Sequence, residues 1–220
     1  MLYDLPPVTR ALLIVNVAIF LLELVPSLRP LLIAYGALWP VGPSQFAGYT
    51  AGGAPVTVGF HFWQIITYAF LHGGWTHILF NMFALWMFGG PIEHLLGAKH
   101  YTFYYFFCAV TAAVAHLLVG HFFIHKFYPT IGASGAIFGL LVAFGVMYPR
   151  MKMFLIFFPV PMPAWVFVIG YILLELFFGV SGYESGVAHF AHLGGAVGGF
   201  VLLQYWRGKL PIRPKRILTR

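Results

Sequence analysis

The sequence predicts an all-α, polytopic membrane protein whose six transmembrane helices form one bundle, with a long, partly embedded loop after the first helix. Of the 220 residues, 61% are apolar and 8% are charged, so most of the chain has to lie in lipid rather than in water. Six apolar runs of helical length alternate with polar or Pro- and Gly-rich stretches. No internal repeat and no separate soluble domain is visible, so we expect residues 1–220 to form a single membrane domain.

The six apolar runs are the predicted helices. They cover residues 10–26, 75–94, 101–121, 133–148, 163–180 and 188–206. The first has the length of a secretory signal, but Pro26-Ser27-Leu28-Arg29-Pro30 follows it rather than a small-residue cleavage site. We therefore expect this run to remain in the chain as a membrane anchor.

The stretch between the first two helices, residues 27–74, is the one long loop. Its segments 31–39 and 60–71 are aromatic and apolar, with Gly and Pro between them. Segments of this kind favour the membrane interface over water. The sequence therefore predicts that the loop is partly embedded.

The distribution of Lys and Arg predicts the orientation. If the N-terminus is inside, only Arg29 and Lys126 are exterior. The ten interior cations are Arg10, Lys99, Arg150, Lys152, Arg207, Lys209, Arg213, Lys215, Arg216 and Arg220. This positive-inside bias predicts two cytoplasmic termini, an exterior first loop, and second, fourth and sixth helices that run from outside to inside. The basic tail 207–220 is then expected to contact anionic lipid rather than nucleic acid, despite the net charge of +7.

Three polar residues lie at the same predicted depth on the three inward-running helices. Ser134 and His192 each lie fourteen residues before an aromatic residue at the cytoplasmic end of their helix, and Asn81 lies thirteen residues before His94. At 1.5 Å per residue, each is roughly 20 Å above the inner boundary of a core about 30 Å thick. The sequence thus places a serine, an imidazole and an amide in one layer of the membrane.

The fourth predicted helix begins near Ser134 and spans only about 22 Å, so its N-terminus ends below the outer surface. Free N–H groups at that depth are tolerated around a water-filled cavity or a ligand. Such a cavity would admit the water that hydrolysis needs. The helix N-terminus would also favour an oxyanion beside the serine.

Small residues are spaced to let the fourth and sixth helices approach each other. Gly135 and Gly139 form one GxxxG face, and Gly195 and Gly199 form another. The close approach would allow a Ser–His hydrogen bond, although such faces also occur in helix pairs without any chemistry.

Two polar residues of the second predicted helix could serve an oxyanion. His77 and Asn81 are four residues apart and share one helical face, from which both can donate hydrogen bonds. The alternative for Asn81 is a hydrogen bond that only packs two helices together.

These segments resemble the motifs of the rhomboid family of intramembrane serine proteases. The matches, in the family's order, are His77-Ile78-Leu79-Phe80-Asn81 with Gly89-Gly90 and Glu93 downstream, Gly132-Ala133-Ser134-Gly135, and His192-Leu193-Gly194-Gly195 with Gly199. The six helices and the long embedded first loop are also similar to the family's minimal core. Each motif is short, but three in order at one depth make the joint signal specific.

The resemblance implies roles for some of the matched residues. Ser134 would be the nucleophile and His192 its general base. The side chains of His77 and Asn81, with the Ser134 backbone N–H, would form the oxyanion hole. Gly132, Gly135, Gly195 and Gly199 would support the site, and the ring of Phe138 would stack on His192 in the place where some members carry tyrosine. The Trp63-Gln64 pair departs from the Trp-Arg of many members, which leaves the fastening of the first loop open.

Neither a metal nor a cofactor is expected. Among ten histidines, His189 and His192 are three residues apart, yet there is no HExxH and a third ligand would have to come from a distant segment. We expect His189 to support the start of the sixth helix and His72 to form a hydrogen bond under the first loop. The single cysteine, Cys108, is expected to be a small buried apolar residue.

Only one acid lies near the depth of the serine. The five acids are Asp4, Glu23, Glu93, Glu175 and Glu184, and none lies beside the two catalytic candidates in sequence. Glu175 has the right depth, and we expect it to have a structural or gating role rather than to be a third catalytic member. The sequence therefore predicts a Ser–His dyad.

The resemblance implies substrates that are transmembrane proteins, cut in or near a membrane segment, by an enzyme that contacts lipid and no nucleic acid. We expect it in the inner membrane of a prokaryotic cell. The alternatives are a non-catalytic rhomboid-like protein that binds transmembrane clients, and a channel or transporter. Transport would predict paired charges or inverted repeats near the midplane, and the sequence contains neither. The fifth helix is the predicted mobile element, because Pro161 and Pro163 punctuate its start, Gly170 lies in its middle and the short loop 181–187 follows it. The resemblance implies that this helix and loop form a cap and a lateral gate against the second helix.

Overall fold

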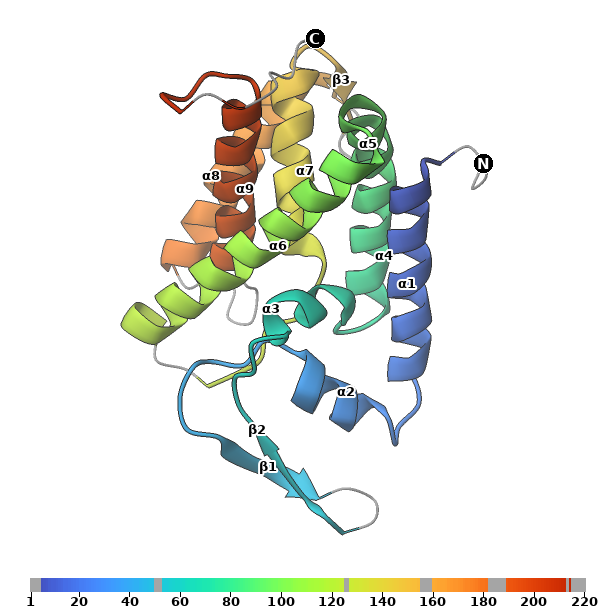
Figure 1. Cartoon of the computed structure of the whole chain (residues 1–220), viewed down its shortest axis with the longest axis vertical. Helices are drawn as coiled ribbons and strands as arrows, with labels where there is room; N and C mark the ends of the chain where they lie inside the picture. Colours follow the sequence, from blue (N-terminus) through green and yellow to red (C-terminus); the bar gives the residue numbers. More distant parts are fainter. Residues whose placement is uncertain are drawn as a thin grey trace.

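The structure is a computed structural model that describes residues 5–49, 53–124, 127–154, 160–181, 189–212 and 214. Long helices packed side by side form its body, and α6 crosses them obliquely (Figure 1). Their bounds are α1 (Pro7–Glu23), α4 (Trp75–Ala84), α6 (Ala98–Val119), α7 (Ser134–Met147), α8 (Ala164–Ser181) and α9 (His189–Trp206). The first loop extends from one end of this body, opposite the end where α1 begins and α9 ends (Figure 1).

Two of the long helical stretches contain a π-helical turn. Helix α4 continues through the π turn η2 (Leu85–Gly89) into α5 (Gly90–Leu96), and α6 continues into the π turn η3 (Gly120–Ile124). The last five predicted helices begin and end within three residues of these bounds.

The first predicted helix, 10–26, is displaced by three residues from α1. The helix begins earlier because Pro7 occupies its first position and the Glu93 carboxylate accepts the free backbone N–H groups of Val8 and Thr9, at 2.9 and 2.6 Å. The helix ends at Glu23, and Pro26 lies in the turn that follows.

The all-α prediction was wrong in the loops, where two short hairpins form. Strands β1 (Gln45–Tyr49) and β2 (Pro55–Val58) pair antiparallel in the first loop, and β3 (Lys152–Met153) pairs with β4 (Met162–Pro163) between α7 and α8. Strand β2 alternates exposed and buried residues, and its two valines join a small apolar cluster with Trp39 and Leu71. Four residues of alternation are too short a pattern to distinguish a strand from a loop in the sequence.

The rest of the first loop includes three short helical segments and is fastened in part by Gln64. It contains α2 (Arg29–Gly36), α3 (Gln64–Thr67) and a 3₁₀ turn, η1 (Tyr68–Phe70). The fully buried Gln64 side chain accepts the backbone N–H groups of Trp39 and His61, at 3.3 and 3.1 Å, and donates to the Gly59 carbonyl oxygen at 3.1 Å. A glutamine can therefore join three segments of this loop, because its amide both donates and accepts. Trp63 and Thr67 add hydrogen bonds to the Tyr35 and Gly36 carbonyl oxygens, at 2.9 and 2.7 Å.

Helix α7 is the centre of the bundle, with twelve of its fourteen residues buried against its neighbours, α6 and α9 above all. Glycines make this packing possible. A Cβ at Gly139 would meet the Cys108 side chain, one at Gly195 would meet the Gly135 carbonyl oxygen, and one at Gly199 would lie 2.6 Å from the Tyr104 hydroxyl. Both predicted GxxxG faces therefore lie at the contacts among α6, α7 and α9.

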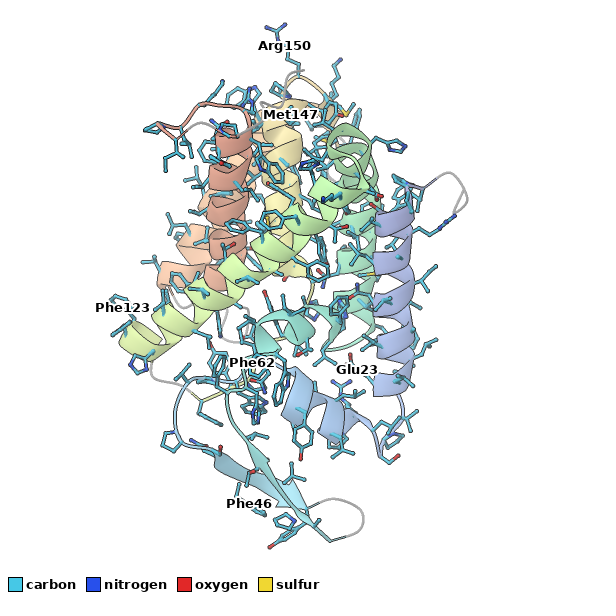
Figure 2. The ribbon with its side chains drawn as sticks, in the orientation of Figure 1. Glu23, Phe46, Phe62, Phe123, Met147 and Arg150 are labelled. Atoms are coloured by element: carbon cyan, nitrogen blue, oxygen red, sulfur yellow. The ribbon has the colours of Figure 1, made fainter. Side chains whose placement is uncertain are left out.

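The outer surface of the bundle is apolar. Side chains such as Ile14 and Leu21 of α1, and Leu173 and Phe177 of α8, point outward and are exposed. Among the described residues, two helical stretches are long and apolar enough to cross a membrane, Ala98–Phe123 and Ala164–Ser181, and α7 is a shorter apolar helix. Arg150 and Phe46 mark opposite ends of the molecule (Figure 2). The count of six spans remains a prediction.

Candidate active site

Ser134 is the first residue of α7, and the segment before it is fixed by a glycine. Gly132 has a φ of +124°, which disfavours a side chain, and its N–H donates to the Tyr68 carbonyl oxygen at 2.9 Å. A Cβ at Gly132 would lie 2.8 Å from the Cε1 and Nε2 atoms of His77. The glycine therefore allows His77 to lie against the chain just before the serine.

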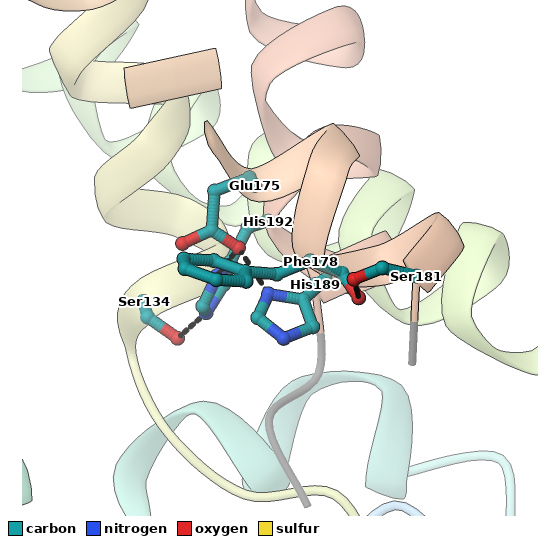
Figure 3. A network of polar contacts seen from close by, with 6 residues as sticks. All are labelled: Ser134, Glu175, Phe178, Ser181, His189 and His192. Atoms are coloured by element: carbon teal, nitrogen blue, oxygen red, sulfur yellow. Dashed lines mark hydrogen bonds and ion pairs between the residues drawn. The ribbon is translucent and has the colours of Figure 1, made fainter. Parts of the chain in front are cut away.

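His192 lies in the first turn of α9 and its Nε2 is 2.7 Å from the Ser134 Oγ (Figure 3). The Phe138 ring, one helical turn after the serine, stacks on the imidazole with centroids 4.5 Å apart and planes 7° apart. Ser134 and His192 are therefore in hydrogen-bond contact, and an aromatic ring fixes the plane of the imidazole.

A carboxylate on α8 contacts the other side of this imidazole. The Glu175 Oε2 atom is 2.8 Å from the Nδ1 of His192 and 2.7 Å from the Nδ1 of His189 (Figure 3). An ionised carboxylate only accepts hydrogen bonds, so both Nδ1 atoms have to carry the proton. The Nε2 of His192 is then the unprotonated nitrogen, and the Ser134 hydroxyl donates to it.

The contact of Glu175 with His192 is the part of the site that sequence reasoning missed. The sequence predicts a structural or gating role for Glu175 and a Ser–His dyad without it. The sequence did contain one signal for this contact, because Glu175 is the one acid near the predicted depth of Ser134. His189 was expected to support the start of the sixth helix. It lies at the start of α9, and its side chain donates to Glu175.

His77 and Asn81 face the serine from α4. The Nδ1 of His77 accepts the Gly73 backbone N–H at 3.1 Å, which leaves the proton on Nε2, beside Gly132. Asn81 is 5% exposed, and its Nδ2 has no hydrogen-bond partner among the described residues. Two N–H donors are thus available near Ser134.

These residues border one cavity of about 490 Å³. Ser134, His192, His77 and Asn81 all line it. Phe80 and Ala84 of α4 and Tyr171 of α8 line it as well, together with the segment 128–131 that leads to the serine. The cavity therefore lies between α4 and α8, the helices predicted to part when a substrate enters.

His72 was predicted to form a hydrogen bond under the first loop. His72 is fully buried beneath the first loop, where its backbone N–H donates to the Glu23 carboxylate at 2.9 Å and its ring packs edge-on against Phe20 and His77.

His189, His192 and Glu175 each offer one ligand atom, and these atoms lie within 4.8 Å of one another, so the cluster has the composition of a metal site. The separations of 2.7 and 2.8 Å match charge-assisted N–H···O hydrogen bonds. The expectation of no metal remains a prediction.

Comparison with known proteins identifies the family. The model of the Rhomboid domain matches residues 59–208, more than half of the chain. The chain belongs to the rhomboid family. Ser134, His192, Glu175, His77 and Asn81 all lie within the matched range. As a rhomboid, the protein is an integral membrane protein of a family that includes serine proteases.

Named relatives of this rhomboid occur in bacteria and in mitochondria. It is 34% identical to Rhomboid protease GluP of Bacillus subtilis over 139 residues, 63% of this chain and 25% of that protein. It is 37% identical to the mitochondrial Rhomboid protein 1 of Saccharomyces cerevisiae over 112 residues, 47% of this chain and 30% of that protein. It is 30% identical to Rhomboid protease GlpG of Klebsiella pneumoniae over 145 residues, 66% of this chain and 41% of that protein. The chain thus matches less than half the length of each of these relatives.

Proposed function

We propose that this rhomboid is an intramembrane serine endopeptidase with Ser134 as the nucleophile and His192 as the general base. The observation that carries the proposal is the 2.7 Å contact between the Ser134 Oγ and the unprotonated Nε2 of His192. This is the separation at which a base can accept the hydroxyl proton during attack. The two residues come from different helices, α7 and α9, which the glycine contacts hold together.

The reaction would follow the order of acyl transfer. His192 Nε2 takes the Ser134 proton as Oγ attacks the carbonyl carbon of the scissile peptide, and the carbonyl oxygen becomes an oxyanion. The imidazolium then gives its proton to the leaving amine, and the C–N bond breaks. A water molecule attacks the acyl-serine ester with His192 again as base, which releases the acid product and restores the serine.

The oxyanion would be stabilised by three donors. These are the Nε2–H of His77, the Nδ2 of Asn81 and the backbone N–H of Ser134 at the start of α7. The unpartnered, buried Nδ2 of Asn81 supports this assignment, because a donor without a partner is costly unless a ligand or water satisfies it. Since these donors line the cavity before any substrate binds, they would need little rearrangement during the reaction.

The substrates would be transmembrane proteins cut in or near a membrane segment. An intact helix hides its carbonyl groups in internal hydrogen bonds, so segments with small or helix-breaking residues would be preferred. The outer surface of the bundle is apolar, which suits substrates that approach through lipid. We further propose that both termini are cytoplasmic and that the protein lies in the inner membrane of a prokaryote.

A serine-directed fluorophosphonate tests the proposal most directly. Wild-type protein in detergent should be labelled, and the Ser134→Ala variant should not. Ser181→Ala, which removes an exposed serine at the end of α8, is the matched control and should be labelled like wild type. Equal labelling of the wild type and the Ser134→Ala variant would contradict the assignment of the nucleophile.

A further inference from the structure

The strongest feature that a Ser–His dyad leaves unused is the carboxylate of Glu175. Its side chain is 8% exposed, and one oxygen, Oε2, meets the Nδ1 atoms of two histidines. Burying a carboxylate is costly unless several donors compensate its charge. The burial of the Glu175 carboxylate therefore indicates that it serves the two histidines that it contacts, His189 and His192.

We propose that Glu175 is a positioning residue for His192, so that the base of this rhomboid works as part of a Ser134–His192–Glu175 triad, with His189 holding the carboxylate in place. The inference rests on the proposed function, since it concerns the same base. Glu175 acts through His192 and does not contact the serine.

The contact with Glu175 determines the orientation of the His192 imidazole. Stacking on Phe138 fixes the plane of the His192 ring. A rotation of the ring by 180° about its Cβ–Cγ bond would return it to the same plane, and it would stack equally well. Only one of the two orientations directs Nε2 at Ser134. The hydrogen bond from Nδ1 to Glu175 selects that orientation and also the tautomer in which Nε2 can accept a proton.

The carboxylate also compensates the charge that His192 gains during the reaction. When His192 takes the serine proton it becomes a cation in a buried site, where few water molecules can solvate it. A carboxylate 2.8 Å from Nδ1 stabilises this cation, and it does so more strongly in the transition state than before reaction, when the imidazole is neutral. Glu175 would therefore lower the barrier to proton transfer rather than tighten substrate binding.

His189 supplies the second hydrogen bond to the Oε2 atom of Glu175, at 2.7 Å. With two N–H donors at 2.7 and 2.8 Å, the Glu175 carboxylate is held on both histidines. His189 is three residues from His192 on α9, so the same helix carries the base and the group that holds its carboxylate in place. The paired spacing of these histidines is thereby explained without a metal ion.

Glu175 comes from α8, and this makes the base depend on where that helix lies. Only three of the eighteen residues of α8 are buried, and Glu175 is one of them. If α8 moved away from α9, the carboxylate would leave His192. The triad would then be complete only when α8 is packed against the site.

The decisive variant is Glu175→Gln, which keeps the shape of the side chain but removes the charge. We expect kcat for a transmembrane substrate to fall on the order of 10²-fold or more, with a much smaller change in KM. Glu175→Asp, which restores a carboxylate, should recover at least about tenfold of that loss. Glu93→Gln is the matched control, because Glu93 is also buried and also accepts two N–H groups, but at the start of α1; its kcat should stay within about twofold of wild type.

A spectroscopic measurement separates positioning from simple packing. In the wild type, ¹⁵N NMR of labelled His192 should show the proton on Nδ1. In Glu175→Gln the amide NH₂ can donate to Nδ1, so a substantial fraction should carry the proton on Nε2. A lower melting temperature with an unchanged His192 spectrum and unchanged kcat would mean that Glu175 only packs α8 against α9.

The results also distinguish this inference from the function on which it rests. Full kcat in Glu175→Gln, with Ser134→Ala inactive, would overturn the triad and leave the protease intact. Cleavage that persists in Ser134→Ala would overturn the protease itself.

Discussion

The interface of α7 and α9 differs sharply from the flank formed by α8. Between α7 and α9 the contacts run through glycines whose added Cβ atoms would meet backbone or buried side chains, and twelve of the fourteen α7 residues are buried. Along α8 most side chains face outward, and Gly170 has open space around it. The proposed nucleophile and base therefore lie in a tightly packed pair of helices, whereas the carboxylate that contacts His192 lies on a loosely packed one. We expect the proposed chemistry to depend on the tight pair, and substrate access to depend on α8.

The largest expected effect falls on the rigid pair. We expect Ser134→Ala and His192→Ala each to lower cleavage of a transmembrane substrate on the order of 10³-fold or more, and the double variant to lose no more than either one, because the two residues act as a unit. Turnover in detergent or liposomes measures this. Additive losses would show that the serine and the histidine work separately.

A comparable loss, confined to large substrates, is expected when α8 is tied to the opposite side of the cavity. Phe83 and Tyr171 are partly exposed on α4 and α8. Cysteines at these positions, joined by a bifunctional thiol reagent, should block cleavage of a transmembrane substrate, while fluorophosphonate labelling of Ser134 continues. Cys108 is fully buried and should not compete for the reagent.

The same cysteine pair without the reagent is the control for this experiment. Unchanged cleavage after cross-linking would move the entry route elsewhere, most simply to the first loop.

A smaller effect is expected at the oxyanion donors on α4. Asn81→Ala should lower turnover by roughly 10²- to 10³-fold, less if the other two donors compensate, because the charge of the oxyanion loses one hydrogen bond. Labelling of Ser134 should persist, since the serine and its base are untouched. A turnover number equal to that of the wild type would remove Asn81 from the site.

The two regions can also be compared through matched glycine substitutions. Gly195→Ala places a Cβ on the Gly135 carbonyl oxygen, so it should lower the free energy of unfolding by about 1–3 kcal/mol or more. Gly170→Ala meets nothing within 4 Å and should raise it by about 0.5–1 kcal/mol, because alanine favours a helix over glycine. Denaturation in micelles measures both. Equal effects of the two substitutions would mean that the packing difference has no energetic consequence.

The smallest expected effect is that of a chelator. Because both histidines of the Glu175 cluster have hydrogen-bond separations from the carboxylate, we expect EDTA to leave proteolysis unchanged. Loss of activity that zinc restores would establish the metal alternative for this cluster.

Sequence alone determined the positions along each helix. Apolar runs locate the helices, and a constant rise per residue converts residue number into depth, so Ser134, His192 and Asn81 could be assigned to one layer without knowing how the helices pack. The stacking of the Phe138 ring on His192 was expected only from the resemblance to the rhomboid family, and the structure has this contact.

Only the tertiary structure decided which faces of the helices meet. Depth says nothing about rotation around a helix axis, and that rotation brings Glu175 to the Nδ1 of His192 rather than toward lipid. The hydrogen bonds from Gln64 to Trp39 and Tyr35 join segments far apart in the chain in the same way. Periodic patterns record how each segment is buried, but not its partner, and so the proposed triad could be inferred only after the helices were packed.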